Sequence, residues 1–402
     1  MTTFLSLLSI ETLLWTAIFI VFYAYLGYGI VLFLLIRLKR IIYGKENWEL
    51  NEQELPAVTF VVAAYNEARW IEDKIKNCLA FDYPLAKIQF FFVTDGSTDN
   101  TPDLIREYPV PNNVVLKLFH QDVRAGKIAA VERIMEFVET PITIYTDANT
   151  DVNAQAIKNI VKFYQDPKVG AVAGEKRIAQ ANADDAAGAG EGIYWKYEST
   201  LKKWDSELYS VVGAAGELFS IRTALFQPVP KDTIIEDFVM TLGIAAQGYK
   251  VKYAHDAIAS ESQSANVKEE LKRKIRIAAG GLQAVWRLRR LFNVFKYPVL
   301  FFQYFSHRVL RWTLAPIALP IILITNVLLA LDGNPFYQIM LACQVFFYLF
   351  ALLGYVFERK KIKIKAFFIP YYFCVMNYAV YRGFLRIVSG RQSVLWERAK
   401  RA

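Results

Sequence analysis

The sequence VTFVVAAYNE at residues 58–67 joins an apolar run to a short polar segment. Residues 58–64 are apolar apart from Thr59, which is typical of a strand buried on both faces of a sheet. The polar segment 65–67 follows directly, at the point where such a strand would end. The stretch therefore predicts an inner strand of an α/β sheet with polar side chains at its carboxyl edge.

Strand-like and helix-like segments alternate from residue 57 to about residue 178. We expect strands at 58–64, 88–93, 114–119 and 142–145, and another that begins at 170. We expect helices at 67–79, 126–138 and 151–164. Repeated β–α units imply a largely parallel sheet covered by helices.

Acidic and polar residues follow the second and fourth predicted strands as well as the first. The segment Thr94–Asp99 reads TDGSTD, and Asp147 and Asn149 flank a single alanine. Open α/β folds bind ligands at the carboxyl edge of the sheet, where these side chains would gather. Asp95 could accept a hydrogen bond from a base or ribose, and Asp147 with Asn149 could hold Mg²⁺ or Mn²⁺ on a diphosphate.

Two further segments complete this set. Glu236 and Asp237 stand in the apolar context IIEDF, where a partly desolvated carboxylate could take a proton from a hydroxyl. Lys127 closes the basic segment Arg124–Lys127, which opens a predicted helix and could hold phosphate. Each segment also has a structural alternative: a helix cap for residues 97–99, a polar turn at 147–149, and a cap or salt bridge at the acidic pair.

The composition indicates a membrane protein. Of the 402 residues 54% are hydrophobic, and the mean hydropathy is +0.22. Uncharged apolar runs at 13–36, 312–331 and 335–357 are long enough to cross a bilayer. The run at 366–381 is shorter and contains Pro370 and Asn377, so we expect it to lie at the interface rather than to span, although a spanning helix stays an alternative.

Charge sets the expected orientation. Basic residues cluster at 37–40 and 359–365, which places both clusters in the cytosol and the N-terminus outside. The net charge of +9 collects at membrane flanks and at 268–296, which fits lipid headgroups and substrate phosphates and excludes a nucleic-acid partner. The three cysteines lack metal-ligand spacing, as expected of reduced thiols in a cytosolic and membrane protein.

These patterns predict five consecutive parts. They are an N-terminal transmembrane helix (1–40), a cytosolic catalytic domain (41–265), basic interfacial helices (266–308), two transmembrane helices (309–358), and an interfacial or third C-terminal membrane segment with a basic tail (359–402). We expect the protein to reside in a bacterial inner or plasma membrane.

Taken together, these residues resemble family 2 glycosyltransferases with a GT-A fold, in their membrane-integrated branch. That branch includes cellulose, chitin and hyaluronan synthases and bacterial poly-N-acetylglucosamine and exopolysaccharide synthases. The resemblance covers roughly residues 55–400, and it implies a Rossmann-like cytosolic domain with a mainly parallel sheet, plus transmembrane and interfacial helices.

The resemblance also implies roles for single residues. Donor binding would fall to Tyr65, Glu67, Asp95, Lys127 and Arg276, and metal binding to Asp147 with Asn149, where the family commonly has a second aspartate. Asp237, with Glu236 beside it, matches the general base that activates the acceptor hydroxyl, and one such base gives inversion at the anomeric carbon. The loop at 213–217, with Gly213, Gly216 and Glu217, looks like the loop that shapes the acceptor pocket.

One motif departs from the family. Processive members carry Gln-x-x-Arg-Trp where this chain has Arg273 in place of Gln and Ile277 in place of Trp, while Arg276 remains. The positive charge that stabilises a departing nucleoside diphosphate survives, but the aromatic platform for the acceptor sugar is lost here. Trp286 and Trp312 are candidates to replace that platform.

The C-terminal tail resembles another feature of such synthases. It contains Trp396 and Arg398 and looks like a cytosolic gating loop that closes over the donor. An amphipathic helix on the membrane is the alternative for this segment.

The leading hypothesis is therefore a metal-dependent, inverting glycosyltransferase that moves a sugar from a nucleotide sugar, by family habit a uridine diphosphate sugar, to a growing β-linked polysaccharide. Transfer of one sugar to a lipid or lipid carrier is the alternative. A homo-oligomer or an accessory export protein would complete the channel for a polymer. A transporter or non-catalytic nucleotide-binding protein is a distant third hypothesis, because the acidic groups are intact and the runs 13–36 and 312–331 carry no ionisable residue.

Overall fold

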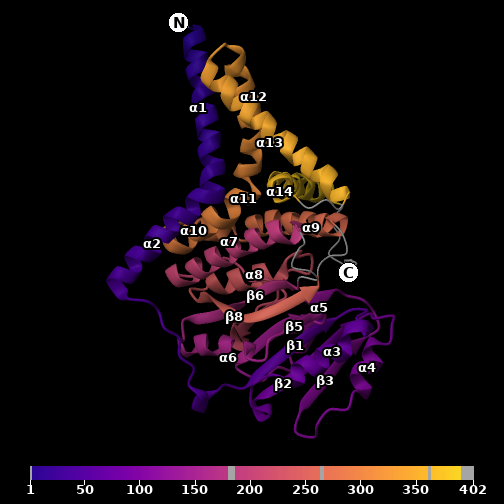
Figure 1. The fold of residues 1–402 in the computed structure, drawn as a ribbon. Coiled ribbons are helices and arrows are strands. Elements are labelled where there is room, and N and C mark those ends of the chain that lie inside the picture. The colour runs from indigo at the N-terminus through magenta and orange to yellow at the C-terminus, as the bar shows by residue number, and fades with distance from the viewer. Residues whose placement is uncertain (1, 180–185, 263–266, 361–363, 391–402) are drawn as a thin grey trace.

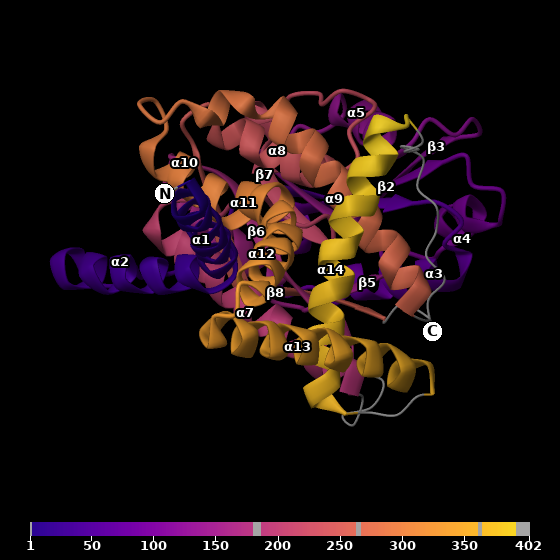
Figure 2. The same ribbon diagram turned by 90° about the horizontal axis from the view of Figure 1, so that it is seen from above.

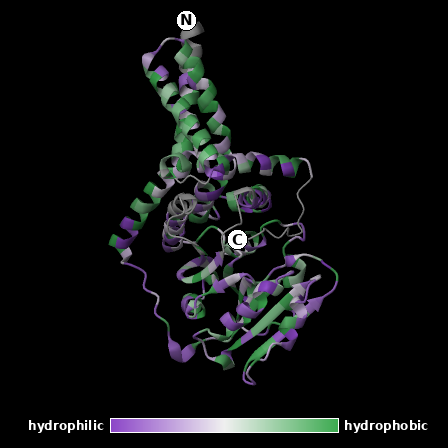
Figure 3. Cartoon of the chain, turned by 45° about the vertical axis from the view of Figure 1, so that its right-hand side comes forward, coloured by the Kyte–Doolittle hydropathy of each residue, from purple (hydrophilic) through white to green (hydrophobic). Residues whose placement is uncertain are grey.

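The computed structural model describes residues 2–179, 186–262, 267–360 and 364–390. A sheet domain lies at the bottom of Figure 1, a layer of helices covers it, and three long helices (α1, α12 and α13) rise above that layer. In Figure 3 hydrophobic residues dominate the rising helices, whereas the sheet domain mixes both kinds. The molecule thus separates an apolar helical part from a mixed α/β part.

The sheet has eight strands in the order β3-β2-β1-β4-β7-β6-β8-β5. The bounds are β1 Val58–Ala64, β2 Ile88–Asp95, β3 Val115–Gln121, β4 Ile142–Asp147, β5 Thr150–Val152, β6 Val169–Ala179, β7 Leu218–Arg222 and β8 Lys250–Ser262. The first four strands pair in parallel, and β7 is antiparallel to both of its neighbours. The predicted sheet of an α/β fold is confirmed.

Alternate residues of the inner strands face two separate hydrophobic cores. Phe60 and Phe90 pack with α3 (Ala68–Leu79), α4 (Thr101–Glu107) and α6 (Ala156–Val161). Val61 and Phe91 pack on the other face with α5 (Lys127–Met135) and α8 (Glu236–Ala245). This alternation explains why the strands read as continuous apolar runs, because both of their faces are buried.

The prediction of one helix over 151–164 is wrong in its first part. Residues Thr150–Val152 form β5, which pairs antiparallel with β8, and α6 begins only at Ala156. The physical reason is the free edge of β8, which takes up Thr150 and Val152 in a ladder that a local helical pattern does not anticipate.

Three described helices are long and apolar enough to cross a membrane, over Ser9–Tyr43, Leu314–Leu331 and Pro335–Arg359. The last two are α12 and α13. The first is bent: a π-helical turn, η1 (Tyr23–Gly27), separates α1 (Thr2–Phe22) from α2 (Tyr28–Tyr43), and α2 slopes away from α1 in Figure 1. This apolar run therefore forms a bent helix rather than a single straight one.

The bend coincides with hydrogen bonds to carbonyl groups of η1. Arg311 Nε donates to the carbonyl oxygen of Ala24 at 2.9 Å, and the Tyr197 hydroxyl donates to that of Tyr25 at 2.7 Å. A π-turn interrupts the regular helical ladder, so its carbonyls need such outside donors. The bend is therefore fixed by residues from other helices.

A helical layer lies between the sheet and the rising helices. It contains α7 (Ala186–Leu208), α9 (Val267–Arg287), α10 (Pro298–Tyr304), the π-turn η7 (Phe305–Val309), α11 (Leu310–Trp312) and α14 (Lys365–Val388). Seen from above, α14 runs along α9 (Figure 2), and it also packs against α13. A Cβ built on Gly383 of α14 would lie 2.7 Å from the backbone nitrogen of Ala279 in α9, so these two helices pack backbone to backbone.

Candidate active site

Parallel pairing brings three polar strand ends to one edge of the sheet. The register sets Ala63 beside Val93 on one side and beside Asp147 on the other. Tyr65 and Asp95 therefore end neighbouring strands, and Asp147 ends the next one. The predicted clustering of these side chains at the carboxyl edge follows from this pairing.

Asp95 is held at this edge by one of its two oxygens. Its Oδ2 accepts from the backbone N–H groups of Ala125 at 3.0 Å and Gly126 at 2.6 Å. Its Oδ1 is buried and accepts no hydrogen bond from the residues that the structure describes. Arg133 Nη1 lies 3.9 Å from this oxygen, as an ion pair without a hydrogen bond, so Oδ1 can still accept a hydrogen bond from a ligand.

An aromatic ring and a guanidinium group stand next to Asp95. Arg124 lies 3.7 Å above the ring of Tyr65. Gly96 has φ +66°, and a Cβ there would lie 2.7 Å from the Arg124 backbone nitrogen, so only glycine fits this turn. Glu67 lies further along the same loop, buried at the start of α3, with its backbone N–H donated to Thr101 Oγ1.

A lysine joins the acidic residues of the predicted catalytic set. Lys127 Nζ lies 2.7 Å from Asp147 Oδ1 and 3.3 Å from Glu236 Oε1. Burial lowers the pKa of Lys127, but the charges of Asp147 and Glu236 outweigh burial and raise that pKa above its ordinary value. Burial raises the pKa of Asp147, and the charge of Lys127 opposes that rise. The sequence placed these residues in separate roles, whereas the structure brings them into one ion-pair cluster.

Asp237 stands in the first turn of α8, beside this cluster. Burial, and then the charge of Glu236, raise the pKa of Asp237 to about 7. Arg276 of α9 faces the same carboxylates, and burial lowers its pKa while Glu236 and Asp237 oppose that change. A carboxylate with a pKa near neutrality is suited to accept a proton at physiological pH.

The loop at 213–217 is anchored against the first turns of α8. Gly213 has φ +88°, and a Cβ there would overlap the ring of Phe238. A Cβ on Gly216 would lie 3.4 Å from both Asp237 Oδ2 and Lys127 Nζ. The two glycines therefore let the backbone of this loop approach the acidic cluster.

Glu217 ends this loop within an ionic network that the sequence did not reveal. It pairs with Lys176 and lies 3.2 Å from Arg273 Nη2, and Arg273 Nη1 lies 3.1 Å from Glu261. Burial favours a higher pKa for Glu217, but the charges of Lys176 and Arg273 outweigh burial and hold that pKa well below its usual range. Arg273, the residue that replaces Gln in the family motif, thus pairs with the buried carboxylate of Glu261 and the half-buried one of Glu217.

The structure separates the two tryptophans that could replace the missing aromatic. Trp312 packs edge-on against Phe238 with ring centroids 5.3 Å apart, next to Asp237 in sequence. Trp286 is 71% exposed and lies against Arg289. Trp312 is therefore the better candidate, whereas Trp396 and Arg398 of the predicted gating loop lie outside the described residues.

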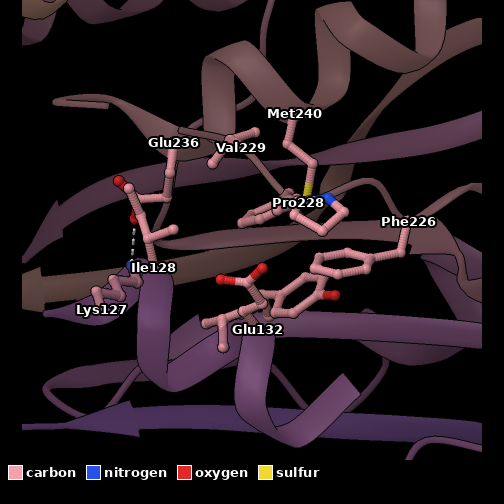
Figure 4. A pocket seen from close by; sticks show the side chains of 11 residues that line it. Lys127, Ile128, Glu132, Phe226, Pro228, Val229, Glu236 and Met240 are labelled. Carbon is pink, nitrogen blue, oxygen red and sulfur yellow. Dashed lines mark ion pairs between the residues drawn. The ribbon is translucent and has the colours of Figure 1, made fainter. Parts of the chain in front are cut away.

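A mainly apolar pocket opens beside the cluster, between α5, α8 and the strands β4 and β7. Figure 4 shows Lys127 and Glu236 together at one side of it, with the carboxylate of Glu132 and the rings of Phe226 and Pro228 further along. The charged cluster thus borders an apolar surface, which keeps water away from part of it.

The residues present fit a divalent cation. Asp147 supplies a carboxylate, and the half-buried Asn149 follows it in the turn between β4 and β5 with an amide oxygen. Over the described ranges, no group of three or more His, Cys, Asp or Glu side chains is close enough to hold a metal alone. A hard cation here would therefore share its coordination with oxygens of a substrate.

Comparison with known proteins places this site in a family. The profile described as Glycosyl transferase family 2 matches residues 59–228. The chain contains a family 2 glycosyl transferase domain. This domain includes the ends of β1, β2 and β4 and the loop at 213–217, so most of the candidate site lies inside it.

The family 2 domain has curated relatives. Poly-beta-1,6-N-acetyl-D-glucosamine synthase of Staphylococcus aureus (strain COL) is 28% identical over 253 residues, which are 62% of this chain and 60% of that protein. The protein of the same name from Staphylococcus epidermidis is 25% identical over 242 residues, or 59% of this chain and 57% of that protein. The matches thus span less than two thirds of the length of these relatives.

A solved structure shares the fold over nearly the whole chain. A mannosyltransferase from Pyrobaculum calidifontis, solved in complex with GDP-Man and Mn²⁺, matches with a TM-score of 0.70 at 22% identity. The alignment covers 95% of this chain and 100% of that one. The likeness therefore extends beyond the family 2 domain to the helices that cover it.

Proposed function

We propose that this protein is a membrane-bound, inverting glycosyltransferase that moves a sugar from a nucleotide sugar to a growing polysaccharide. The observation that carries the proposal is Asp237, with a pKa raised to about 7, beside the Lys127–Asp147–Glu236 cluster. The family 2 domain and the similarity to poly-N-acetylglucosamine synthases support the reaction class and the acceptor.

The donor would lie across the carboxyl edge of the sheet. Asp95 Oδ1, which accepts no hydrogen bond from the described residues, would accept one from the nucleotide base, and Tyr65 with Arg124 would flank that base. Lys127 and Arg276 would face the diphosphate. Asp147 and Asn149 would hold Mg²⁺ or Mn²⁺, which neutralises charge on the diphosphate when bound.

In the transfer step Asp237 would accept the proton of the acceptor hydroxyl. The hydroxyl oxygen then bonds to the anomeric carbon while the bond from that carbon to the diphosphate breaks, and Arg276 and Lys127 stabilise the charge that leaves. Attack from the side opposite the leaving group inverts the anomeric configuration. An α-linked donor would therefore give a β-linked product.

The membrane arrangement belongs to the same proposal. Basic residues at 37–40 and 359–365 favour a cytosolic catalytic domain, an N-terminus outside and interfacial positions for α9 and α14. A homo-oligomer or an export partner would be needed for a wide glycan channel, since three spanning helices among the described residues enclose only a narrow one.

A second candidate is the transfer of one sugar to a lipid acceptor. Two observations favour it over polymerisation: Arg273 is occupied in an ionic network, and Ile277 stands where processive members carry an aromatic platform. Product length separates the two candidates directly.

The test is a product assay on the full-length protein in lipid nanodiscs, with Mg²⁺ or Mn²⁺ and labelled uridine and guanosine diphosphate sugars. We expect the D237N variant to lose at least about a hundredfold in turnover, as for removal of a general base, while donor affinity stays within twofold. Chelation of divalent cations should also stop turnover. Full turnover in D237N would remove Asp237 from the base role, and full turnover in chelator would refute metal dependence.

A further inference from the structure

A buried lysine of α3 lies behind the turn between β4 and β5, which carries the predicted metal ligands. Lys74 is only 2% exposed. Its ammonium nitrogen donates to the backbone oxygen of Thr150 at 2.8 Å, and it lies 3.3 Å from the hydroxyl oxygen of Thr150 and 3.5 Å from that of Thr146. Over the described ranges no carboxylate lies within ion-pair distance of it, and the ring of Phe60 is 5.7 Å away. A buried ammonium group therefore holds the end of this turn.

The two threonines close the turn on which Asp147 and Asn149 stand. Thr150 Oγ1 lies 2.8 Å from the backbone oxygen of Asp147 and 2.8 Å from Thr146 Oγ1. Thr146 Oγ1 also lies 2.8 Å from the backbone oxygen of Glu217. The contacts of Lys74 thus reach, through one hydroxyl group, the backbone of the predicted metal ligand and, through another, the loop that ends at Glu217.

A second contact from α3 shows that holding this part of the chain does not in itself require a charge. Asn77, one helical turn after Lys74, donates to the backbone oxygen of Val152 at 2.7 Å and accepts from its N–H at 3.0 Å. This neutral amide secures β5, whereas burial of an ammonium group without a carboxylate partner is unfavourable. Burial lowers the pKa of Lys74 to about 8, so the charged form still predominates at neutral pH. The charge therefore needs a reason beyond one satisfied carbonyl.

The forces on Asp147 supply that reason. Lys127 attracts the Asp147 carboxylate from α5, on one face of the sheet, at 2.7 Å. Lys74 holds the backbone that follows Asp147 from α3, on the opposite face. Hydrogen bonds from charged donors are roughly twice as strong as those between neutral groups, and a metal site depends on groups that orient its ligands. A charged donor on α3 is thus suited to keep the turn in place while Lys127 pulls on its carboxylate.

We propose that Lys74 is a positioning residue for the divalent cation: through Thr150 it fixes the turn from which Asp147 and Asn149 reach that cation. This inference rests on the proposed glycosyltransferase function and adds to it a residue that contacts neither the cation nor the substrate. Lys74 takes no part in the transfer of the sugar or of a proton. Its loss therefore weakens the binding of the cation, whereas the nucleotide base site at the ends of β1 and β2 stays intact.

The test measures Mn²⁺ binding to the full-length protein in nanodiscs with saturating UDP and, in parallel, GDP, from the electron paramagnetic resonance signal of free Mn²⁺. K74M removes the ammonium group at similar volume, and K76M is its matched control on the exposed face of α3. A second pair changes the partner: T150V removes the hydroxyl group and keeps the shape, and T150S keeps the hydroxyl group. Melting temperature and nucleotide affinity, both without metal, show whether each variant is folded.

We expect Mn²⁺ affinity to fall roughly ten- to a hundredfold in K74M and T150V, as for the loss of other groups that orient metal ligands, and to stay within about twofold in K76M and T150S. Excess Mn²⁺ should restore sugar turnover in K74M, which a purely structural role of Lys74 would not allow. Wild-type Mn²⁺ affinity in folded K74M overturns the proposal, as does turnover that excess Mn²⁺ fails to restore. If K74M does not fold, wild-type Mn²⁺ affinity in T150V overturns it.

Sugar turnover on the same nanodiscs separates this inference from the function itself. Turnover by the wild type, together with equal Mn²⁺ affinity in wild type and K74M, would refute the inference alone. Weaker Mn²⁺ binding in K74M, without turnover of any nucleotide sugar by the wild type, would refute the function and leave a cation site that Lys74 positions. A wild type that binds no Mn²⁺ with either nucleotide would overturn the metal assignment and this inference together.

Discussion

Lys127 Nζ lies 2.7 Å from Asp147 Oδ1, so a lysine at the start of α5 is fixed to the carboxylate that ends β4. The same ammonium group lies 3.3 Å from Glu236 and thereby also reaches the start of α8. It occupies the region that a diphosphate and its cation would share. Binding of the donor must therefore redistribute the contacts of Lys127.

Replacement of Lys127 by methionine tests this relationship. The variant leaves Asp147 and Glu236 without their shared cation, so we expect Mn²⁺ to raise its melting temperature more than that of the wild type. Turnover should fall ten- to a hundredfold, as for the loss of one charged hydrogen bond of about 1.5–3 kcal/mol. The exposed-site variant K117M serves as control. An equal Mn²⁺ effect in K127M and wild type would contradict the prediction.

The raised pKa of Asp237 predicts a pH profile. A general base must be ionised, and the pKa of Asp237 is raised to about 7 by burial and by Glu236. We expect kcat/KM to fall about tenfold per pH unit below 7 and to level off above it. The measurement is kcat/KM between pH 5 and 9 with donor saturating. In E236Q the midpoint should move to lower pH, because the neighbouring negative charge is removed; a midpoint that stays in place would argue against Asp237 as the titrating group.

Gly213 and Gly248 form a matched pair for the loop near the active site. Both have a positive φ, +88° at Gly213 and +98° at Gly248. A Cβ added to Gly213 would overlap Phe238, whereas a Cβ added to Gly248 would have no atom within 4 Å. G248A should cost about 1–2 kcal/mol of backbone strain alone. G213A should lower the melting temperature further and reduce turnover at least tenfold, because the overlap displaces the first turn of α8. Similar effects of the two variants on turnover would show that the Gly213–Phe238 contact does not position Asp237.

Glu198 is the central anion of a buried cluster below the membrane helices. It lies 2.8 Å from His307 and 2.9 Å from Arg308 and Arg311. E198Q leaves these groups without their shared carboxylate, and such losses cost about 3–5 kcal/mol. We expect a clear fall in melting temperature in nanodiscs, whereas E72Q on the exposed face of α3 should leave it unchanged. Equal stability of E198Q and wild type would refute the central role of Glu198.

The sequence predicted the part of the site that follows apolar strands. Asp95 and Asp147 could be placed because each directly follows a run that only a buried strand explains, and parallel pairing then brings the two together. The strand β7 and the long strand β8 were not predicted, since their pairing depends on β6, which is distant in sequence. Local pattern also put residues 151 and 152 in a helix, where the edge of β8 draws them into the sheet.

The charged groups that pair across the fold were beyond prediction for a different reason. Nothing in the sequence distinguishes Lys202 from Lys203, and only the packing of α7 buries one and exposes the other. Arg273 could be recognised as a departure from a family motif, but its pairing with Glu217 and Glu261 depends on the meeting of α9 with the loop before β7 and with β8.

The bend in the N-terminal helix has a consequence for how this molecule can be divided. The carbonyl of Ala24 and the carboxylate of Glu198 both accept from Arg311, so the anchor shares one buried ionic cluster with the catalytic half. A soluble fragment that begins after residue 43 would open this cluster to water and leave Arg311 without one acceptor. Anchor and enzyme therefore form one cooperative unit, and a chimera with a foreign anchor would have to carry a matching acceptor for Arg311.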